Sequence, residues 1–228
     1  MKKQNFSISE ALQFGWNTIK SNLGFFIVLF LIAIGAIIII PSLILGSITI
    51  LLEICGIPTH ESSVIRPILM IIDVLAILFI YQILFMGFLR ITIIFCDNEK
   101  SEFRDLFSCF PLFFKYLFGL ILYILIVSVG LILLIIPGII WLLKFQFFNY
   151  FIIDKKLGPI KALKGSAKIT KGSILKLFLF SLLLLCINIL GFLCFFIGQF
   201  ATIPMTMVAI AFVYRKLLSL IETSEIYK

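Results

Sequence analysis

The sequence is poor in charged residues. Of its 228 residues, 13% are charged and 62% are hydrophobic, whereas soluble domains carry roughly 25% charged and roughly 45–50% apolar residues. A soluble protein of this composition would have too few polar side chains to cover its surface. The scarcity of charge therefore excludes a soluble globular protein and predicts an all-α integral membrane protein, with residues 1–228 forming a single polytopic membrane domain.

Residues that bind metals or carry out catalysis are equally scarce. The sequence has one histidine, His60, which lies near Glu53, Cys55 and Glu61 in one polar segment. A metal site needs three or four convergent ligands, so we interpret this segment as a solvated loop. The five cysteines form no C-x-x-C pair, and the sequence contains no Gly-rich phosphate loop, H-E-x-x-H or G-x-S-x-G. We therefore expect neither an enzyme nor a metal or other cofactor.

Long hydrophobic tracts are abundant. They cover residues 24–57, 66–96, 112–153 and 172–221, and a membrane-spanning helix needs about 20 residues. The third tract is about twice that length, so we expect it to fold back at a structural turn formed by Pro137 and Gly138. The fourth tract needs a similar turn within 190–204, with Pro204 in the first turn of the last helix.

The first tract is too long for one span and too short for two. We expect one span from about residue 24 to 41, a kink at Pro41 and a partly buried outer extension, with re-entrance of 42–57 left open. The sequence therefore predicts six transmembrane helices. With a cytoplasmic N-terminus, nearly all of the 19 lysines and arginines lie on the inner side, and only Arg66 lies outside. This asymmetry places both termini in the cytoplasm.

A short amphipathic segment precedes each pair of spans. These segments cover residues 7–26, 102–120 and 157–178, and they favour three units, each made of a surface helix followed by two spans. In the third segment, one face of a helix carries four lysines within about 80°: Lys161, Lys164, Lys168 and Lys171. Such an interfacial helix could hold its ammonium groups at lipid phosphates, or the lysines could serve only to set topology.

Polar side chains inside the membrane are the remaining functional candidates, because their burial in lipid costs free energy. Gln82 and Gln146 are among them, and the five that we take as candidate site residues are Asp73, Lys144, Asn149, Asn188 and Gln199. An ion pair between Asp73 and Lys144 is one interpretation, although the two residues fall at different depths along their helices. We expect Lys144 to face the interior of the bundle or a wet crevice.

Four stretches together resemble a known family. They read "FMGFLRITIIFCDNEKSEFRDLF" (85–107), "LLIIPGIIWLLKFQFFNYFIID" (133–154), "ALKGSAKITKG" (162–172) and "IPMTMVAIAFVYRKLL" (203–218). The chain is similar to uncharacterised bacterial multi-pass membrane proteins related to the membrane domain of glycerophosphoryl diester phosphodiesterases. The resemblance implies six spans, a Pro-Gly turn and a basic cytosolic helix whose "A-x-x-x-S-x-x-x-x-x-G" pattern falls on Ala162, Ser166 and Gly172. It implies no catalytic activity for this chain.

The expected function is therefore non-enzymatic. We expect a protein of the bacterial cytoplasmic (inner) membrane that organises or regulates membrane components, with its basic cytosolic face on anionic phospholipid. The alternative is a small-solute transporter or channel, which a wet cavity lined by Lys144, Asn149, Asn188 and Gln199 would favour. No nucleic-acid-binding motif is present, and a protein partner or a homo-oligomer remains open.

Overall fold

The computed structural model describes residues 6–57, 64–194 and 198–226, which form helices and no strand. Two short 3-10 helices, η1 (Phe103–Phe107) and η2 (Phe110–Leu112), lie between α3 and α4. The α-helices follow in the order α1 (Ile8–Ser21), α2 (Leu23–Ile54), α3 (Ile65–Cys96), α4 (Phe113–Leu133), α5 (Ile135–Phe145), α6 (Phe148–Lys155), α7 (Pro159–Ile169), α8 (Ile174–Leu193) and α9 (Gln199–Ile226).

Six helical stretches in the described part of the chain are long and apolar enough to cross a membrane. They are α2, α3, the stretch that ends with α4, the stretch formed by α5 and α6, α8, and α9. The fold is therefore consistent with a multi-pass membrane protein, as the sequence predicts. Helices suit this environment because they satisfy their own backbone hydrogen bonds where no water can.

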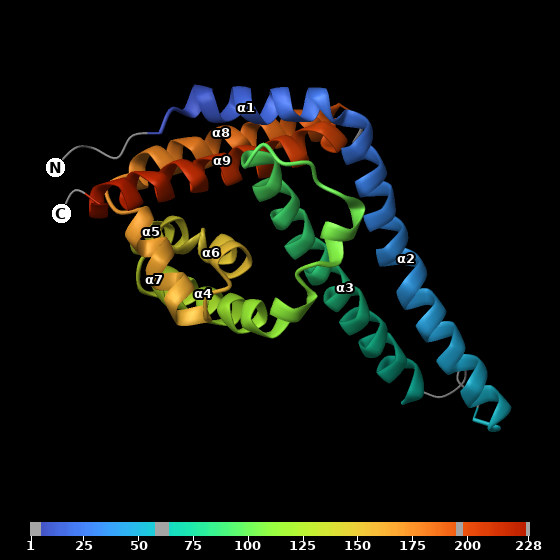
Figure 1. Ribbon diagram of the computed structural model, residues 1–228. Helices are drawn as coiled ribbons and strands as arrows, with labels where there is room; N and C mark the ends of the chain where they lie inside the picture. Colours follow the sequence, from blue (N-terminus) through green and yellow to red (C-terminus); the bar gives the residue numbers. More distant parts are fainter. Residues whose placement is uncertain (1–5, 58–63, 195–197, 227–228) are drawn as a thin grey trace.

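Helix α9 lies at the centre of the molecule, in contact with α1, α2, α3, α7 and α8. Helix α1 lies along α9, and α2 with α3 forms a hairpin that projects away from the other helices (Figure 1). The approach of α1 to α9 depends on Gly15, since a Cβ atom there would lie 2.7 Å from the carbonyl oxygen of Met205. We use the name body for α1, α4 to α9 and the half of α3 that ends at Cys96.

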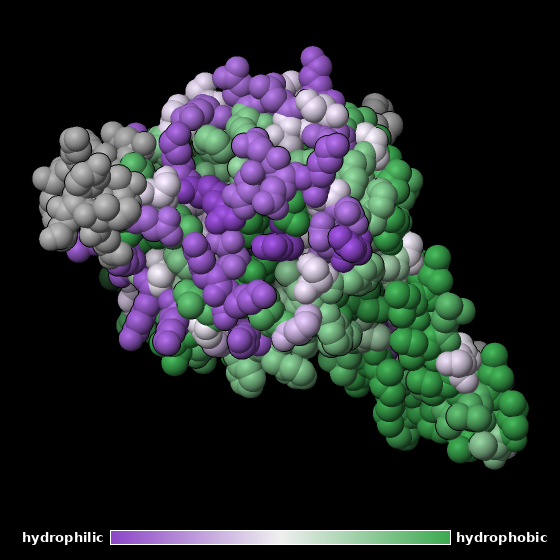
Figure 2. All heavy atoms as spheres, in the orientation of Figure 1, coloured by the Kyte–Doolittle hydropathy of each residue, from purple (hydrophilic) through white to green (hydrophobic). Residues whose placement is uncertain are grey.

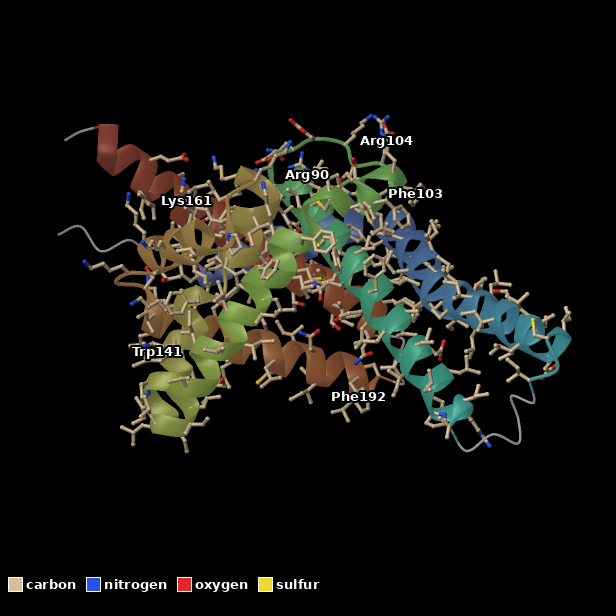
Figure 3. The ribbon with its side chains drawn as sticks, turned by 90° about the horizontal axis from the view of Figure 1, so that it is seen from below. Arg90, Phe103, Arg104, Trp141, Lys161 and Phe192 are labelled. Atoms are coloured by element: carbon tan, nitrogen blue, oxygen red, sulfur yellow. The ribbon has the colours of Figure 1, made fainter. Side chains whose placement is uncertain are left out.

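The charged side chains gather on one side of the molecule. Figure 3 shows Arg90, Arg104 and Lys161 on one side and Trp141 and Phe192 on the opposite side. Figure 2 shows many hydrophilic residues on the visible face of the body and an almost entirely hydrophobic surface on the projecting hairpin. This is the charge separation that the sequence predicts, and we call the charged side the polar side.

Two predictions about proline are wrong. The span that begins at Leu23 does not end near residue 41, because α2 continues through Pro41 to Ile54. Residues 42–54 are therefore part of the same helix, and their apolar side chains are largely exposed. A proline removes one backbone hydrogen bond, which leaves the others intact in an environment that offers no alternative partners. Pro204 likewise lies inside α9 and not in its first turn, because α9 begins at Gln199.

The predicted turn at Pro137 and Gly138 is displaced by a few residues. Helix α4 ends at Leu133, Leu134 is extended with φ −162° and ψ 143°, and α5 begins at Ile135. Pro137 therefore lies in the first turn of α5, where its missing N–H would have no partner within the helix anyway. Gly138 contributes close packing, since a Cβ atom on Gly130 of α4 would lie 3.0 Å from its Cα atom.

Candidate functional site

An ionic cluster joins three helices on the polar side. The Arg215 guanidinium of α9 donates two hydrogen bonds to the Asp154 carboxylate of α6, over 2.7 and 3.0 Å, and one to Asp97 at the end of α3. The Tyr214 hydroxyl also donates to Asp154, over 3.0 Å. The Asp154 side chain is only 9% exposed, so its charge depends on this forked, charge-assisted contact.

Arg215 therefore holds the polar ends of α3, α6 and α9 together. In the sequence, Arg215 contributes only to the charge asymmetry, and no local pattern predicts its partners. The signal in the sequence is that Asp97 and Asp154 each stand directly at the inner end of a predicted span. An unpaired carboxylate at such a place costs free energy, so each aspartate predicts a cation on a neighbouring helix.

The fourth predicted span is interrupted between α5 and α6, and side chains of α7 form hydrogen bonds with the backbone at this break. The Ser166 hydroxyl of α7 donates to the carbonyl oxygen of Lys144 over 2.9 Å and accepts a hydrogen bond from the N–H of Phe147 over 3.1 Å. The Thr170 hydroxyl donates to the same carbonyl over 3.1 Å. Ser166 and Thr170 are both buried. The backbone groups released by the break thus keep partners, as buried polar groups require.

These hydrogen bonds give the serine motif a structural meaning. Ala162 is fully buried, as Ser166 is, on the face of α7 that contacts α4, α5 and α6. Gly172 has φ +86°, a left-handed conformation that favours glycine and ends the turn after α7. Ala162 and Ser166 therefore pack α7 against the break, Gly172 allows the turn that follows α7, and the opposite face of α7 is exposed.

That opposite face carries the predicted lysines. Lys161, Lys164 and Lys168 lie on α7, Lys171 follows in the turn after it, and all four are exposed. The apolar face of α7 does not lie against lipid as a whole, because Leu163 and Ile169 are buried in the body. The lysines are therefore displayed by a helix that the protein itself holds in place.

The five predicted intramembrane polar residues do not converge. Asn188 donates to the carbonyl oxygen of Leu184 over 2.9 Å and to Thr206 on α9 over 3.4 Å. Asn149 accepts from the N–H of Tyr150, while Gln199 is the first residue of α9. Within the described residues, Asp73 and Lys144 form no ion pair, and the Lys144 ammonium lies 5.6 Å from the centre of the Phe145 ring.

The described residues include no group of three His, Cys, Asp or Glu side chains that could hold a metal ion. His60 and Glu61 lie outside the described residues. The histidine segment therefore stays a prediction.

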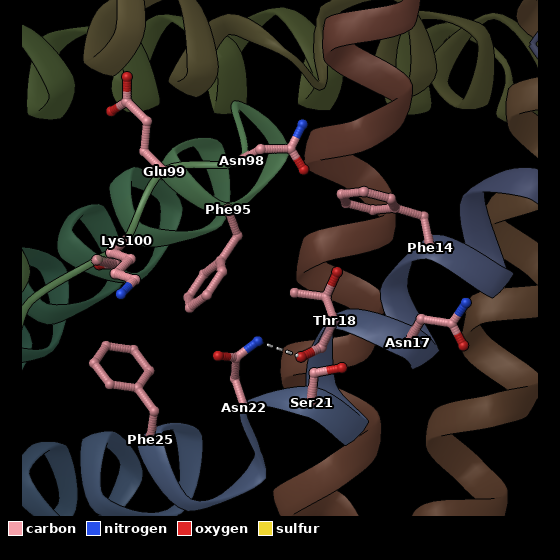
Figure 4. Close-up of a pocket in the computed structure, with 11 residues that line it drawn as sticks. Phe14, Asn17, Thr18, Ser21, Asn22, Phe25, Phe95, Asn98, Glu99 and Lys100 are labelled. Carbon is pink, nitrogen blue, oxygen red and sulfur yellow. Dashed lines mark hydrogen bonds between the residues drawn. The ribbon is translucent and has the colours of Figure 1, made fainter.

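Two cavities stand out in the described part of the chain. One, of about 570 Å³, lies where the α1–α2 corner meets the loop after α3, and its walls include Phe25, Phe95 and Lys100 (Figure 4). The other, of about 260 Å³, is an apolar groove between α2, α3 and α9. Neither cavity is lined by Lys144, Asn149, Asn188 or Gln199, the set that would favour a transporter.

Comparison with known proteins gives a similarity to one family over part of the chain and assigns no activity. Residues 112–224 are similar to the family described as "Domain of unknown function (DUF7847)". The matched stretch begins just before α4 and ends within α9, so it includes α7, the α5–α6 break and two members of the ionic cluster, Asp154 and Arg215. No curated protein and no solved structure matches the chain.

Proposed function

We propose that this is a non-enzymatic protein of the bacterial cytoplasmic membrane that organises or regulates membrane components by holding its basic face on anionic phospholipid. The observation that supports the proposal is the lysine row of α7, Lys161, Lys164, Lys168 and Lys171, which is exposed on the polar side while the other face of α7 is docked on the body. A docked helix presents its charges without having to fold at the membrane.

The four lysines together can attract an anionic bilayer appreciably. Each lysine near an anionic bilayer contributes about 1 kcal/mol, and the attraction extends over about one Debye length. In this proposal α1 and α7 are interfacial helices, both termini are cytoplasmic, and each surface helix begins a unit that continues with two spans. The relation of the chain to the membrane domain of glycerophosphoryl diester phosphodiesterases is part of the same proposal and rests on sequence resemblance alone.

Lipid selectivity of the full-length protein tests the proposal. Spin-labelled phosphatidylglycerol and phosphatidylcholine report which lipid is held at the protein surface in reconstituted bilayers. We expect the wild type to favour the anionic label, and the triple variant Lys161→Gln, Lys164→Gln, Lys171→Gln to lose most of that preference. Adding Lys168→Gln should lower it further, and salt should shrink the difference between wild type and variant.

A matched control removes the same number of charges elsewhere on the polar side, through Lys20→Gln, Arg104→Gln and Lys115→Gln. We expect this variant to keep most of the anionic preference. An equal loss in both triple variants would mean that the α7 row has no special role in lipid contact and serves only to set topology.

The proposed orientation is tested by topology reporters. Fusions after residue 60 and after residue 165 should report opposite sides of the membrane, with residue 165 in the cytoplasm. Equal signals from the two fusions would contradict the six-span arrangement.

The alternative function is a small-solute transporter or channel, and one observation favours it. Discontinuous spans often form solute sites, and the break between α5 and α6 leaves the Gln146 amide nitrogen buried without a hydrogen-bond partner among the described residues. Proteoliposome swelling in glycerol and conductance in KCl test this alternative. Uptake that is abolished by Gln146→Leu would favour transport over lipid organisation.

A further inference from the structure

We propose that the cavity between the α1–α2 corner and the loop after α3 binds the headgroup of a zwitterionic phospholipid that carries a phosphate and a primary amine. Its volume of about 570 Å³ falls within the range of about 300–1,000 Å³ for small-molecule sites. This site is separate from the lysine row on α7 and does not depend on the function proposed above.

The inner wall of the cavity is aromatic. Phe25 comes from the first turn of α2 and Phe95 from the last turn of α3, and their ring centres lie 5.8 Å apart, edge to face. Phe14 of α1 lines the cavity on another side, where it stacks on Phe212 of α9 at 4.7 Å (Figure 4). Because α2 and α3 enter the apolar region at this point, the rings lie where the glycerol and first methylene groups of a lipid would be.

Polar groups also line the cavity. Asn17, Ser21 and Asn22 contribute amide and hydroxyl groups from the α1–α2 corner. The Asn22 side-chain nitrogen donates to the carbonyl oxygen of Thr18 over 2.9 Å, which fixes the corner in shape (Figure 4). Such groups can donate hydrogen bonds to phosphate oxygens. The cavity thus offers both aromatic rings and hydrogen-bonding groups, as an amphipathic ligand requires.

The loop contributes two charged side chains, Lys100 and Glu99, and they lie at different distances from the aromatic rings. Lys100 points toward the Phe25 ring, whereas the Glu99 carboxylate points away from the rings (Figure 4). A phospholipid presents its chains, then its phosphate, then its headgroup amine in the same order. Lys100 is therefore placed for the phosphate and Glu99 for the amine. Because one positive and one negative side chain balance, the cavity suits a zwitterionic headgroup better than an anionic one.

Native mass spectrometry of the full-length protein, released from bilayers of equimolar phosphatidylethanolamine, phosphatidylcholine and phosphatidylglycerol, tests the proposal. We expect the wild type to retain phosphatidylethanolamine at least several-fold over phosphatidylcholine, because a methylated amine cannot donate hydrogen bonds to Glu99. Glu99→Gln should abolish this preference. Glu99→Lys should replace this preference by a preference for phosphatidylglycerol, since the cavity would then carry two positive charges.

The control is Glu222→Gln, which removes a carboxylate from the polar side outside the cavity and should leave the preference unchanged. Equal retention of phosphatidylethanolamine and phosphatidylcholine by the wild type would overturn the proposal, as would loss of the preference in Glu222→Gln. Adding glycerophosphoethanolamine tests whether the occupant of the cavity is a soluble compound and not a membrane lipid. If that compound displaces the lipid at equal concentration, the occupant is a soluble phosphodiester and the lipid assignment is wrong.

Discussion

Helices α2 and α9 both qualify as membrane spans, yet they contact different surroundings. In its most hydrophobic window, α2 has 17% of its residues buried within the protein, whereas α9 has 56%. The order of hydropathy is the reverse, because α2 is the most hydrophobic of the six stretches and α9 is among the least. The most hydrophobic helix, α2, is therefore one of the two least buried stretches, together with α3.

The difference follows from the nature of the solvent. Lipid chains are as apolar as leucine, so burying apolar surface between helices brings no gain from water, and close packing of small residues matters more. Helix α9 has such residues, including the fully buried Ala209 and Ala211, and it receives Gly15 of α1 at close range. Helix α2 exposes large side chains such as Leu43 and Leu51. In these two helices, high hydropathy goes with exposure and not with burial, which is the pattern expected of a helix that contacts lipid.

The largest effect should come from breaking the ionic cluster in the body. Arg215→Ala leaves the Asp154 carboxylate, 9% exposed, without its cation, and we expect the free energy of unfolding to fall by about 3–5 kcal/mol. Thermal and SDS-induced unfolding of the purified protein measure this loss. Arg215→Lys should be intermediate, because lysine keeps the charge but not the forked contact.

The matched control for Arg215 is Arg104→Ala. Arg104 pairs with Glu102 at 2.9 Å, but its side chain is 81% exposed, so its loss should cost about 1 kcal/mol or less. Asp154→Asn combined with Arg215→Ala should cost less than the sum of the two single changes. Equal losses for Arg104→Ala and Arg215→Ala would show that the cluster does not hold the body together.

Paired glycine substitutions compare the body and the hairpin directly. A Cβ atom on Gly87 would overlap the backbone carbonyl of Leu106 in η1, whereas one on Gly46 of α2 would meet nothing within 4 Å. We expect Gly87→Ala to lower the free energy of unfolding by about 1–3 kcal/mol. Gly46→Ala should be neutral, or stabilising by about 0.5–1 kcal/mol through helix propensity.

The same unfolding assay measures both glycine variants. A large loss for Gly46→Ala would mean that the open face of α2 is covered by another chain in the membrane, and that the hairpin is not a lipid-facing element. A neutral Gly87→Ala would mean that η1 can move away from α3 at little cost.

Removing one hydroxyl from α7 should have a smaller effect than breaking the ionic cluster. Ser166→Ala leaves the N–H of Phe147 without its partner, while Thr170 still donates to the carbonyl of Lys144. We expect a loss of about 1–2 kcal/mol in the free energy of unfolding. Ser181→Ala, on the half-exposed surface of α8, is the control and should change little. Hydrogen exchange should also speed up near residues 144–147 if the hydrogen bonds at the break are lost.

The broad arrangement could be read from the sequence because composition and tract length determine it. Six helical stretches long enough to span a membrane, a turn within a few residues of Pro137 and the gathering of charge on one side all follow from hydrophobic lengths and charge positions. The break between α5 and α6 could not be predicted, because its stability comes from Ser166 and Thr170, about 20 residues away along the chain. The partners of Arg215 depend on helix packing in the same way, and no local pattern encodes them.

The smallest effect should come from the side chain of Lys144, although its backbone matters to the body. The structure uses its carbonyl oxygen for two hydrogen bonds from α7, whereas its ammonium forms no ion pair among the described residues. Lys144→Leu keeps the backbone contacts and removes a charge that is costly near lipid, by about 2.5–3.5 kcal/mol at the centre of a span.

We therefore expect Lys144→Leu to express as well as the wild type or better, with a free energy of unfolding within about 0.5 kcal/mol of the wild-type value or above it. Lys144→Arg should behave like the wild type in the same assay. If lysine is kept for function and not for stability, Lys144→Leu should lose anionic-lipid preference or solute uptake while staying folded, and Lys144→Arg should lose less. A folded Lys144→Leu variant with unchanged lipid preference and unchanged uptake would remove Lys144 from the functional candidates and leave only its backbone role at the break.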